Sequence, residues 1–291
     1  MLRNLYTFAS FLVLGASALP APTGAPSVDV SPDGRRIVFT RDGGLYTMSI
    51  DGGQAKRLAD PSSTDGYARW SPDGRRIAFA CLRSNFDNVC IADVATSRIT
   101  ALTHDSLTRR ITSVDWSDEG EAVAVAFGES AQGFDIVSAD GSGRQSFTVE
   151  PIGRTGTRGI TRLVFAHDRR SVLLQRASPG TPARLYRYDP RLRDERQITE
   201  GAASAILPRA TGDGRRLFFI ESDSPTRARL VLRDIQAATQ RVVSSMTGDR
   251  ARVTDLSVSR DGKTVVLTAA DTLWSVNVSS GKWQALASGV K

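Results

Sequence analysis

The stretch SPDGRRI occurs twice without change, at Ser31–Ile37 and again at Ser71–Ile77. Within SPDG, proline presets φ at the second position, Asp tolerates the third, and Gly supplies a left-handed residue, so the stretch predicts a hairpin turn. Apolar, β-branched and aromatic residues follow each copy, in RRIVFT (Arg35–Thr40) and RRIAFA (Arg75–Ala80). These residues lack helical spacing and predict a strand that is covered on both faces.

Degraded copies of this turn recur along the chain. The six copies begin at Ser31 (SPDG), Ser71 (SPDG), Ser117 (SDEG), Ala166 (AHDR), Thr211 (TGDG) and Ser259 (SRDG). Successive copies are 40 to 49 residues apart, a period typical of propellers, solenoids and arrays. In the second repeat, strands are predicted at Tyr67–Ser71, Arg75–Cys81, Asn88–Asp93 and Arg98–Thr103. Four strands in each of six repeats predict an all-β, six-bladed β-propeller of antiparallel blades, formed by residues 27–291 as a single domain.

One segment conflicts with this prediction. Residues Ser224–Val243 include good helix formers and could form an amphipathic helix. The repeat register, however, places Ala228–Asp234 where Leu45–Asp51 and Arg184–Asp189 lie in their own repeats. Local propensity is a weak argument against such an alignment, so we predict strands here.

The first 18 residues predict a Sec-type signal peptide. Arg3 precedes an apolar run at residues 5–15 that is too short to span a bilayer, and Ala16–Ala18 forms a small-x-small cleavage site. We expect cleavage after Ala18 and a Pro-rich leader at residues 19–26. An uncleaved anchor is the alternative. The sequence thus predicts a periplasmic or secreted bacterial protein without a membrane span.

The two cysteines, Cys81 and Cys90, fall in the second and third predicted strands of one blade. A hairpin would bring them face to face, and an oxidising compartment favours a disulfide between them. Two buried free thiols are the alternative. A zinc site would need more ligands than the nearby sequence offers.

The formal net charge is +7, and only four of the basic residues are lysines. A basic protein can bind nucleic acid, but turn acids offset the neighbouring arginines, and export argues against a nucleic-acid partner. Paired arginines follow several of the turns, and we interpret them as a solvated rim: Arg35–Arg36, Arg75–Arg76, Arg169–Arg170 and Arg215–Arg216.

The first two repeats carry a family resemblance. The stretches VDVSPDGRRIVFTRDGGLYTMSIDGGQAKRLA (28–59) and ARWSPDGRRIAFAC (68–81) resemble the repeat of the TolB-type propeller, which has a PDG turn in place of the WD signature. The resemblance extends from Ser27 to about Leu286. It implies a periplasmic binding protein, because the TolB propeller docks a peptidoglycan-associated lipoprotein. We expect this chain to lack the N-terminal α/β domain of TolB, and with it the contact to an inner-membrane partner.

The sequence offers few groups for chemistry. It has no G-x-S-x-G motif, and we expect no hydrolase domain after the propeller. Metal-dependent propeller enzymes need several His, Asp or Asn ligands at the central channel. The two histidines, His104 and His167, are predicted on opposite faces, and we interpret each as a solvated loop residue.

The first strands carry polar residues near the predicted channel. Asp29 and Asp115 stand two residues before their turns, and as carboxylates they could hold calcium. The equivalent positions in the other repeats are Arg69, Val164, Arg209 and Ser257. This mixture favours a charge-paired lining. The aromatic residues Trp70, Trp116 and Phe165 recur one position later, and we interpret them as interblade core and not as a platform for sugars.

Recognition is predicted at one end of the propeller. The end that carries the SPDG-type turns, here called the turn face, has short and repetitive connections. The opposite end, the loop face, has longer connections that differ from one another, such as those from Asp60 and Glu150. Arg and Tyr are frequent in interface hot spots. The predicted partner-binding residues are Asp65, Tyr67, Arg109, Arg110, Arg154, Arg158, Arg250 and Arg252.

The sequence therefore predicts a non-enzymatic, exported propeller that binds an envelope protein or polymer, with a peptidoglycan-associated lipoprotein as the partner implied by the resemblance. We expect a monomer with no cofactor, no bound metal and no catalytic residues. The alternative is a metal-dependent propeller hydrolase or lyase that acts on a small or saccharide substrate at the central channel.

Overall fold

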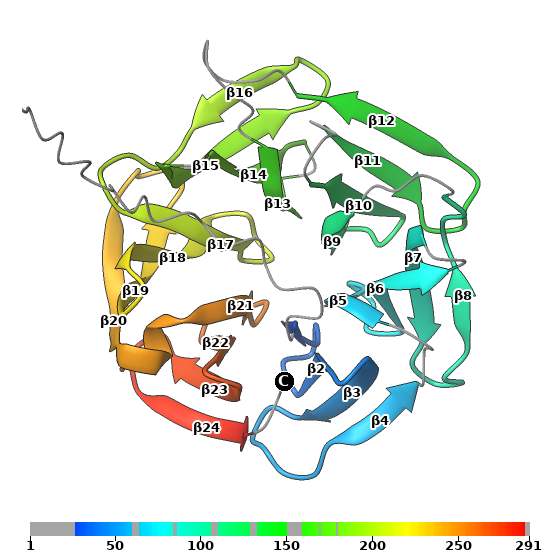
Figure 1. Cartoon of the computed structure of the whole chain (residues 1–291), viewed down its shortest axis with the longest axis horizontal. Helices are drawn as coiled ribbons and strands as arrows, with labels where there is room; N and C mark the ends of the chain where they lie inside the picture. The colour runs from blue at the N-terminus through cyan, green and yellow to red at the C-terminus, as the bar shows by residue number, and fades with distance from the viewer. Residues whose placement is uncertain are drawn as a thin grey trace, which may run out of the picture.

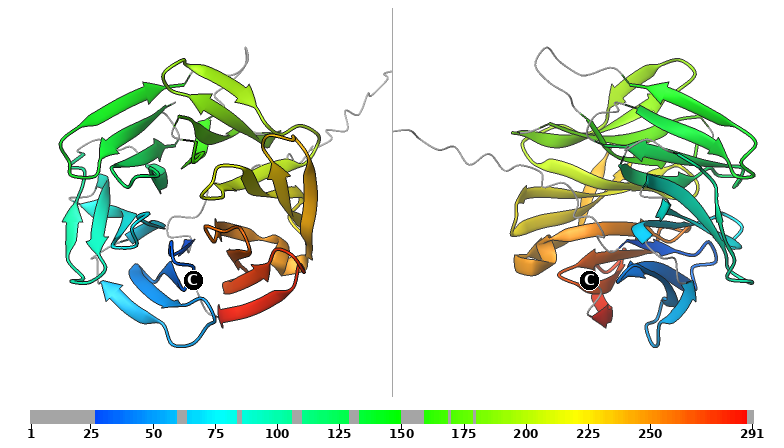
Figure 2. Two further views of the ribbon diagram at one scale, coloured as in Figure 1. Left: turned by 180° about the vertical axis from the view of Figure 1, so that it is seen from behind. Right: turned by 45° about the vertical axis from the view of Figure 1, so that its right-hand side comes forward.

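The computed structural model describes residues 27–59, 64–83, 86–105, 110–128, 133–149, 159–168, 170–178 and 180–288. Its strands form six antiparallel sheets of four strands each, arranged as blades around a common axis (Figure 1). Figure 2 shows the same ring from behind and obliquely. The prediction of a six-bladed β-propeller is confirmed. The predicted signal peptide and leader lie outside the described residues.

The four strands of each blade follow sequence order from the axis outward. Blades 1 and 2 contain β1 (Val28–Val30), β2 (Arg36–Arg41), β3 (Gly44–Ser49), β4 (Lys56–Ala59), β5 (Thr64–Trp70), β6 (Arg76–Arg83), β7 (Phe86–Asp93) and β8 (Ile99–Ala101). Blades 3 and 4 contain β9 (Ile111–Trp116), β10 (Ala122–Phe127), β11 (Gly133–Ser138), β12 (Arg144–Thr148), β13 (Gly159–Phe165), β14 (Val172–Ser178), β15 (Thr181–Asp189) and β16 (Asp194–Gln197). Blades 5 and 6 contain β17 (Ser204–Ala210), β18 (Arg216–Ser224), β19 (Arg227–Asp234), β20 (Gln240–Thr247), the short 3₁₀ helix η1 (Gly248–Ala251), β21 (Val253–Val258), β22 (Thr264–Ala269), β23 (Thr272–Asn277) and β24 (Trp283–Ser288).

The segment with helical propensity forms β19 and the start of β20, so the strand prediction is confirmed. Among the residues that the structure describes, no helix has the length and apolar character needed to cross a membrane.

The SPDG stretch forms a self-contained turn. The hydroxyl of Ser31 accepts a hydrogen bond from the Arg36 amide at 2.9 Å and donates one to the Asp33 carboxylate at 2.6 Å. Gly34 has a φ of 70°, a conformation that L-residues with a Cβ rarely adopt. The second copy has the same contacts. In blade 4, where Pro and Gly are both missing, His167 has a φ of 55°.

Neighbouring blades share their apolar clusters. Trp70 packs with residues of blades 1 and 2, Trp116 with residues of blades 2 and 3, and half-buried Phe165 with residues of blades 3 and 4. Both Trp side chains are buried. The prediction that these recurring aromatics form the interblade core is confirmed.

The predicted disulfide links β6 to β7 in blade 2. Cys81 and Cys90 are bonded with their Cα atoms 5.9 Å apart. They are not directly opposite, because Cys90 pairs with Phe79 and Cys81 with Asn88 in the strand register, so the bond runs diagonally across the hairpin. The disulfide fits an exported protein.

In the described part of the chain, no strand is exchanged between the first and last blades. Instead, side chains of β21 accept hydrogen bonds from backbone amides of β1 that have no strand partner. The Val28 amide donates to Asp255 at 2.9 Å, and the Val30 amide donates to the Ser257 hydroxyl at 3.0 Å. Ser257 in turn donates to Asp29 at 2.6 Å. An apolar cluster from β1–β3 and β22–β24 packs beside these bonds.

Candidate functional site at the propeller axis

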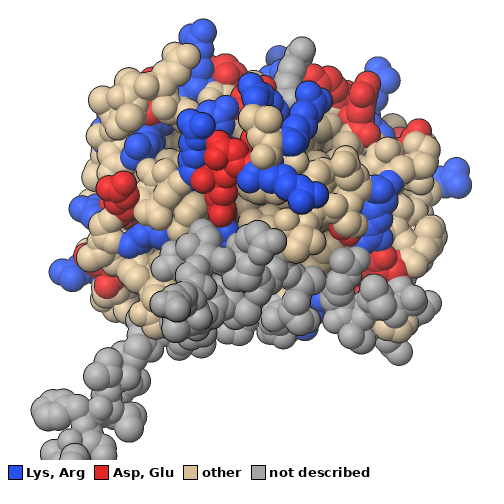
Figure 3. All heavy atoms as spheres, turned by 90° about the horizontal axis from the view of Figure 1, so that it is seen from above, with Lys and Arg blue, Asp and Glu red and all other residues tan. Residues whose placement is uncertain are grey.

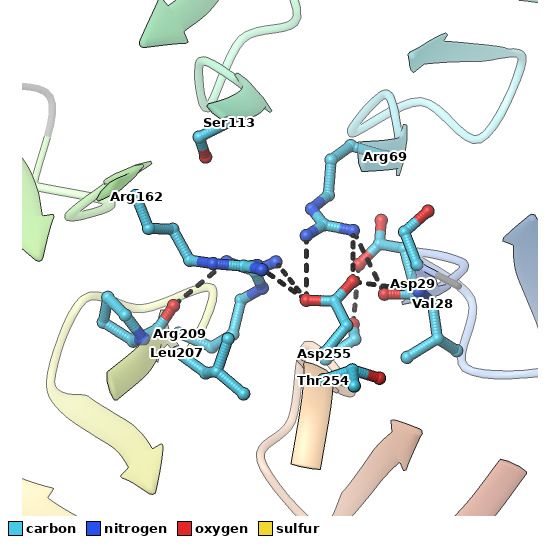
Figure 4. A network of polar contacts seen from close by, with 12 residues as sticks. Val28, Asp29, Arg69, Ser113, Arg162, Leu207, Arg209, Thr254 and Asp255 are labelled. Atoms are coloured by element: carbon cyan, nitrogen blue, oxygen red, sulfur yellow. Dashed lines mark hydrogen bonds and ion pairs between the residues drawn. The ribbon is translucent and has the colours of Figure 1, made fainter. Parts of the chain in front are cut away.

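The inner strands contribute polar side chains to the axis at two register positions. The first position, two residues before each turn, holds Asp29, Arg69, Asp115, Val164, Arg209 and Ser257. The second position, two residues earlier, holds Ser27, Tyr67, Ser113, Arg162, Leu207 and Asp255. Figure 4 shows several of these side chains converging from different blades.

Asp255 is the centre of a buried charged group that we call the axial cluster: Arg69, Arg162, Arg209 and Asp255. Arg69 contacts both Asp255 oxygens, at 3.1 and 3.2 Å. Arg162 contacts the same carboxylate at 2.6 Å, and Arg209 reaches it at 3.4 Å (Figure 4). The four side chains are only 2 to 9% exposed. Three guanidinium groups therefore share one carboxylate away from solvent.

Irregular backbone precedes all three arginines of the axial cluster. The pairing register shifts immediately before Arg69 in β5, Arg162 in β13 and Arg209 in β17. Two residues before Arg69 and Arg209, Tyr67 and Leu207 adopt φ values of 58° and 57°. Such left-handed conformations are rare outside glycine, and bulges of this kind re-aim the side chains that follow them.

The acids of the first register position are held by backbone amides of the next blade. Asp29 accepts a hydrogen bond from the Trp70 amide at 2.8 Å, and Asp115 accepts one from the Phe165 amide at 2.7 Å. Asp255, at the second register position, likewise accepts a hydrogen bond from the Val28 amide. Inner-strand amides have no neighbouring strand on the axis side, so these carboxylates satisfy donors that would otherwise be buried without partners.

Burial and charge oppose each other in the axial cluster. Burial raises the pKa of Asp255, but Arg69, Arg162 and Arg209 outweigh it and hold that pKa below its ordinary value. Burial and the nearby positive charge of Arg69 lower the pKa of Arg209 to about 9. Burial raises the pKa of Asp29 despite its contacts with positive charge. Of the three arginines, Arg209 is thus the one whose buried positive charge is least compensated by nearby negative charge.

A hollow of about 360 Å³ opens from the turn face beside the axial cluster, and Arg209 lines it. We call it the turn-face hollow. Its apolar lining includes Pro32, Trp70, Pro72, Trp116 and Phe165. Its charged and titratable lining includes Asp29, Asp115, Asp118, Glu119, His167, Arg209, Asp213 and Arg260. Acidic groups thus outnumber basic ones in this lining.

His167 differs from its predicted role as a solvated loop histidine. Its Nδ1 contacts the Asp118 carboxylate in the turn of the adjacent blade, and its side chain is 27% exposed. Burial lowers the pKa of His167, but the Asp118 hydrogen bond and the charge of Asp115 outweigh it and raise that pKa. His104 is exposed and follows β8 at the other end of its blade. The histidine in the degenerate turn therefore ties two blades together.

The arginine pairs are also only partly a solvated rim. Arg35 is exposed, but Arg36 stacks 4.8 Å from the centre of the Trp70 ring of the next blade. Arg76 stacks on Trp116 at the same distance and donates to the Gly120 carbonyl at 2.9 Å. For Arg36 and Arg76 the prediction is wrong, because their contacts lie between blades, which a single repeat does not reveal. Arg170 is exposed and contacts Asp189 of its own blade, as a residue of a solvated rim would.

The predicted partner-binding residues that the structure describes are distributed around the ring. Arg110 is exposed before β9, whereas Arg250 lies in η1 before β21, on the opposite side of the ring (Figure 1). Arg250 stacks 4.6 Å from the Trp274 ring, Arg252 is exposed, and Tyr67 is half-buried in the second register position. Arg109, Arg154, Arg158 and the side chain of Asp65 lie outside the described residues.

Figure 3 shows basic and acidic side chains interspersed on the described surface of the side that it views. A continuous positive surface is the feature that would attract a polyanionic partner.

The axis has the charge-paired lining that the sequence predicts, but its central acid was missed. Arg69 and Arg209 pair with Asp255, which stands at the second register position together with Arg162. An alignment of the repeats two residues before the first register position would have shown both Arg162 and Asp255. In the part of the chain that the structure describes, no three His, Cys, Asp or Glu side chains gather as metal ligands would.

Comparison with known proteins places the fold. No known family profile matches the chain. Tricorn protease homolog 1 from Streptomyces coelicolor is 25% identical over 161 residues, which is 53% of this chain and 15% of that protein. The chain thus spans about a seventh of the length of that curated relative.

Three solved structures share the architecture. TolB from Acinetobacter baumannii superposes with a TM-score of 0.66 at 15% identity, over 91% of this chain and 64% of the other. Oligogalacturonate lyase in complex with manganese superposes with a TM-score of 0.62 at 14% identity, over 90% of this chain and 76% of the other. A chain of a nidogen/laminin complex superposes with a TM-score of 0.67 at 9% identity, over 86% of this chain and 91% of the other. The chain has the fold of a TolB-like six-bladed β-propeller.

Proposed function

We propose that this chain is an exported, non-enzymatic binding protein that docks an envelope protein at the turn-face hollow. The observation that carries the proposal is how the carboxylates of the hollow are used. Asp29 and Asp115 hold backbone amides of neighbouring blades, and Asp118 holds His167. Asp29 and Asp115 thus serve as acceptors for buried backbone amides and help to shape a rigid surface.

The lining of the hollow suits a polypeptide segment. Proline and aromatic side chains offer apolar contact, and exposed Glu119 and Arg260 offer charged contacts at its border. Concave sites with an apolar floor and a few polar groups are the usual form of binding sites. The Cys81–Cys90 disulfide supports export, and cleavage after Ala18 remains a prediction.

A metal-dependent lyase is the second candidate, because the fold resembles oligogalacturonate lyase in complex with manganese. The described axial residues do not fit a divalent cation. The central acid, Asp255, already has three guanidinium groups around it, and their positive charge would repel a metal ion.

Affinity capture from envelope extracts tests this function, with the exported chain as bait. The double variant Glu119→Arg/Arg260→Glu alters the border of the turn-face hollow. The matched double variant Arg110→Glu/Arg252→Glu alters the loop face, where the sequence predicts binding. We expect the first variant to lose the partner that wild type captures and the second to retain it. Loss with the loop-face variant alone would move the site to the loop face, and no specific partner for wild type would overturn the function.

A further inference from the structure

The axial cluster has one guanidinium group with weak protein contacts. Arg209 reaches Asp255 at 3.4 Å, whereas Arg162 reaches it at 2.6 Å. Apart from that contact, Arg209 donates to the Pro208 carbonyl, and its buried Nε has no hydrogen-bond partner among the described residues. The Nε of Arg69 also has none, but Arg69 contacts both oxygens of Asp255. Buried donors without partners are costly and rare.

Arg209 is also the arginine of the cluster that borders the turn-face hollow. Its side chain extends from β17 toward Asp255 (Figure 4). Since its contact with Asp255 is the longest of the three, Arg209 loses least by turning toward a group that enters from the turn face. Arg69 and Arg162 would then remain to balance Asp255.

We infer that the axial cluster is a receptor for one carboxylate at the tip of a peptide segment that docks in the turn-face hollow. Arg209 is the group that binds this carboxylate. This inference rests on the proposed function and specifies its ligand. A guanidinium fork matches a carboxylate with two parallel hydrogen bonds, and the negative charge would offset the effect of burial, which lowers the pKa of Arg209.

The neighbouring acids restrict the ligand further. Asp29 and Asp115 line the same hollow, so a tip with a single negative charge is favoured over a dianion such as phosphate. Asp118, Glu119 and Asp213 lie nearer the turns and favour basic residues next to that tip. The expected ligand is therefore one carboxylate within a basic segment, either a chain terminus or an acidic side chain.

Tryptophan fluorescence of the exported protein tests this inference, since Trp70 and Trp116 line the hollow. The probes are acetate, acetamide, phosphate, and the tripeptide Lys-Gly-Gly as free acid and as C-terminal amide. We expect saturable binding of acetate and of the free-acid tripeptide, at least tenfold tighter than acetamide and the amide. An N-acetylated Lys-Asp-Gly amide, which carries only a side-chain carboxylate, distinguishes a side chain from a terminus.

The variant Arg209→Gln should lose at least tenfold in affinity for these carboxylates, while Arg215→Gln, an exposed arginine in the turn of the same blade, should not. Equal binding of acetate and acetamide to wild type would overturn the inference without reference to any variant. So would tighter binding of phosphate, or equal losses in the two variants. If the probes fail but the hollow variant still loses its captured partner, the inference fails and the proposed function stands. If the probes bind but wild type captures no partner, the inference stands and the proposed function fails.

Discussion

Arg69 and Asp255 form a buried ion pair at 3.1 Å, although 186 residues separate them in the sequence. The pair joins blade 2 to blade 6 across the inner end of blade 1, because Arg69 also donates to the Val28 carbonyl and Asp255 accepts from the Val28 amide. The same contact therefore closes the ring and fixes the charge at its axis.

Removal of the central acid should be strongly destabilising. Asp255→Asn leaves three buried guanidinium groups without their shared carboxylate, and breaking a buried ion pair in this way costs about 3 to 5 kcal/mol. Urea unfolding of wild type and variant measures the difference. Asp223→Asn removes an acid from a surface pair with Arg227 and should change stability by about 1 kcal/mol or less. Equal effects of the two substitutions would show that the axial cluster does not hold the ring together.

The His167–Asp118 contact should make stability depend on pH. The pKa of His167 is raised in the folded protein, so the pair stabilises fully below the unfolded value of about 6.5 and loses its effect as the pH rises through the folded value. The melting temperature of wild type should exceed that of His167→Gln most at pH 5.5 and least at pH 9. A difference that stays constant or grows with pH would contradict this assignment.

The disulfide should stabilise blade 2. On the chain-entropy model, closing a loop of this size contributes about 2.5 to 3 kcal/mol. Urea unfolding of the oxidised protein and of Cys81→Ser/Cys90→Ser measures the contribution, and alkylation of the denatured, non-reduced protein checks that both thiols are blocked. Two alkylated cysteines in protein purified from the periplasm would refute the bond.

Metal removal should have no effect under the binding function. Three guanidinium groups surround the central acid, so purified protein should contain no stoichiometric metal and should melt at the same temperature with and without chelator. Elemental analysis and thermal melts provide both measurements. A bound metal at one equivalent, with a lower melting temperature after chelation, would favour the lyase alternative.

The repeat made the fold predictable from sequence, because SPDG is a local turn whose contacts lie within a few residues, as those of Ser31, Asp33 and Arg36 show. The disulfide was predictable for the same reason, since Cys81 and Cys90 share one hairpin.

Contacts between blades were harder to predict. The pairing of Arg69 with Asp255, the stacking of Arg36 on Trp70 and the contact of His167 with Asp118 each join different repeats. A repeat alignment gives the position of a residue in its blade but not its partner in the next blade. The turn-face hollow arises from such contacts, whereas sequence reasoning favoured the loop face because its connections vary more.

Site-specific photo-cross-linking tests the central claim, that an envelope protein docks in the turn-face hollow, most directly. A photoreactive amino acid replaces exposed Glu119 at the border of the hollow or exposed Arg110 on the loop face, and cross-links are formed in intact cells. We expect one discrete protein adduct from position 119 and none from position 110. An adduct from position 110 alone, or none from either position, would contradict it.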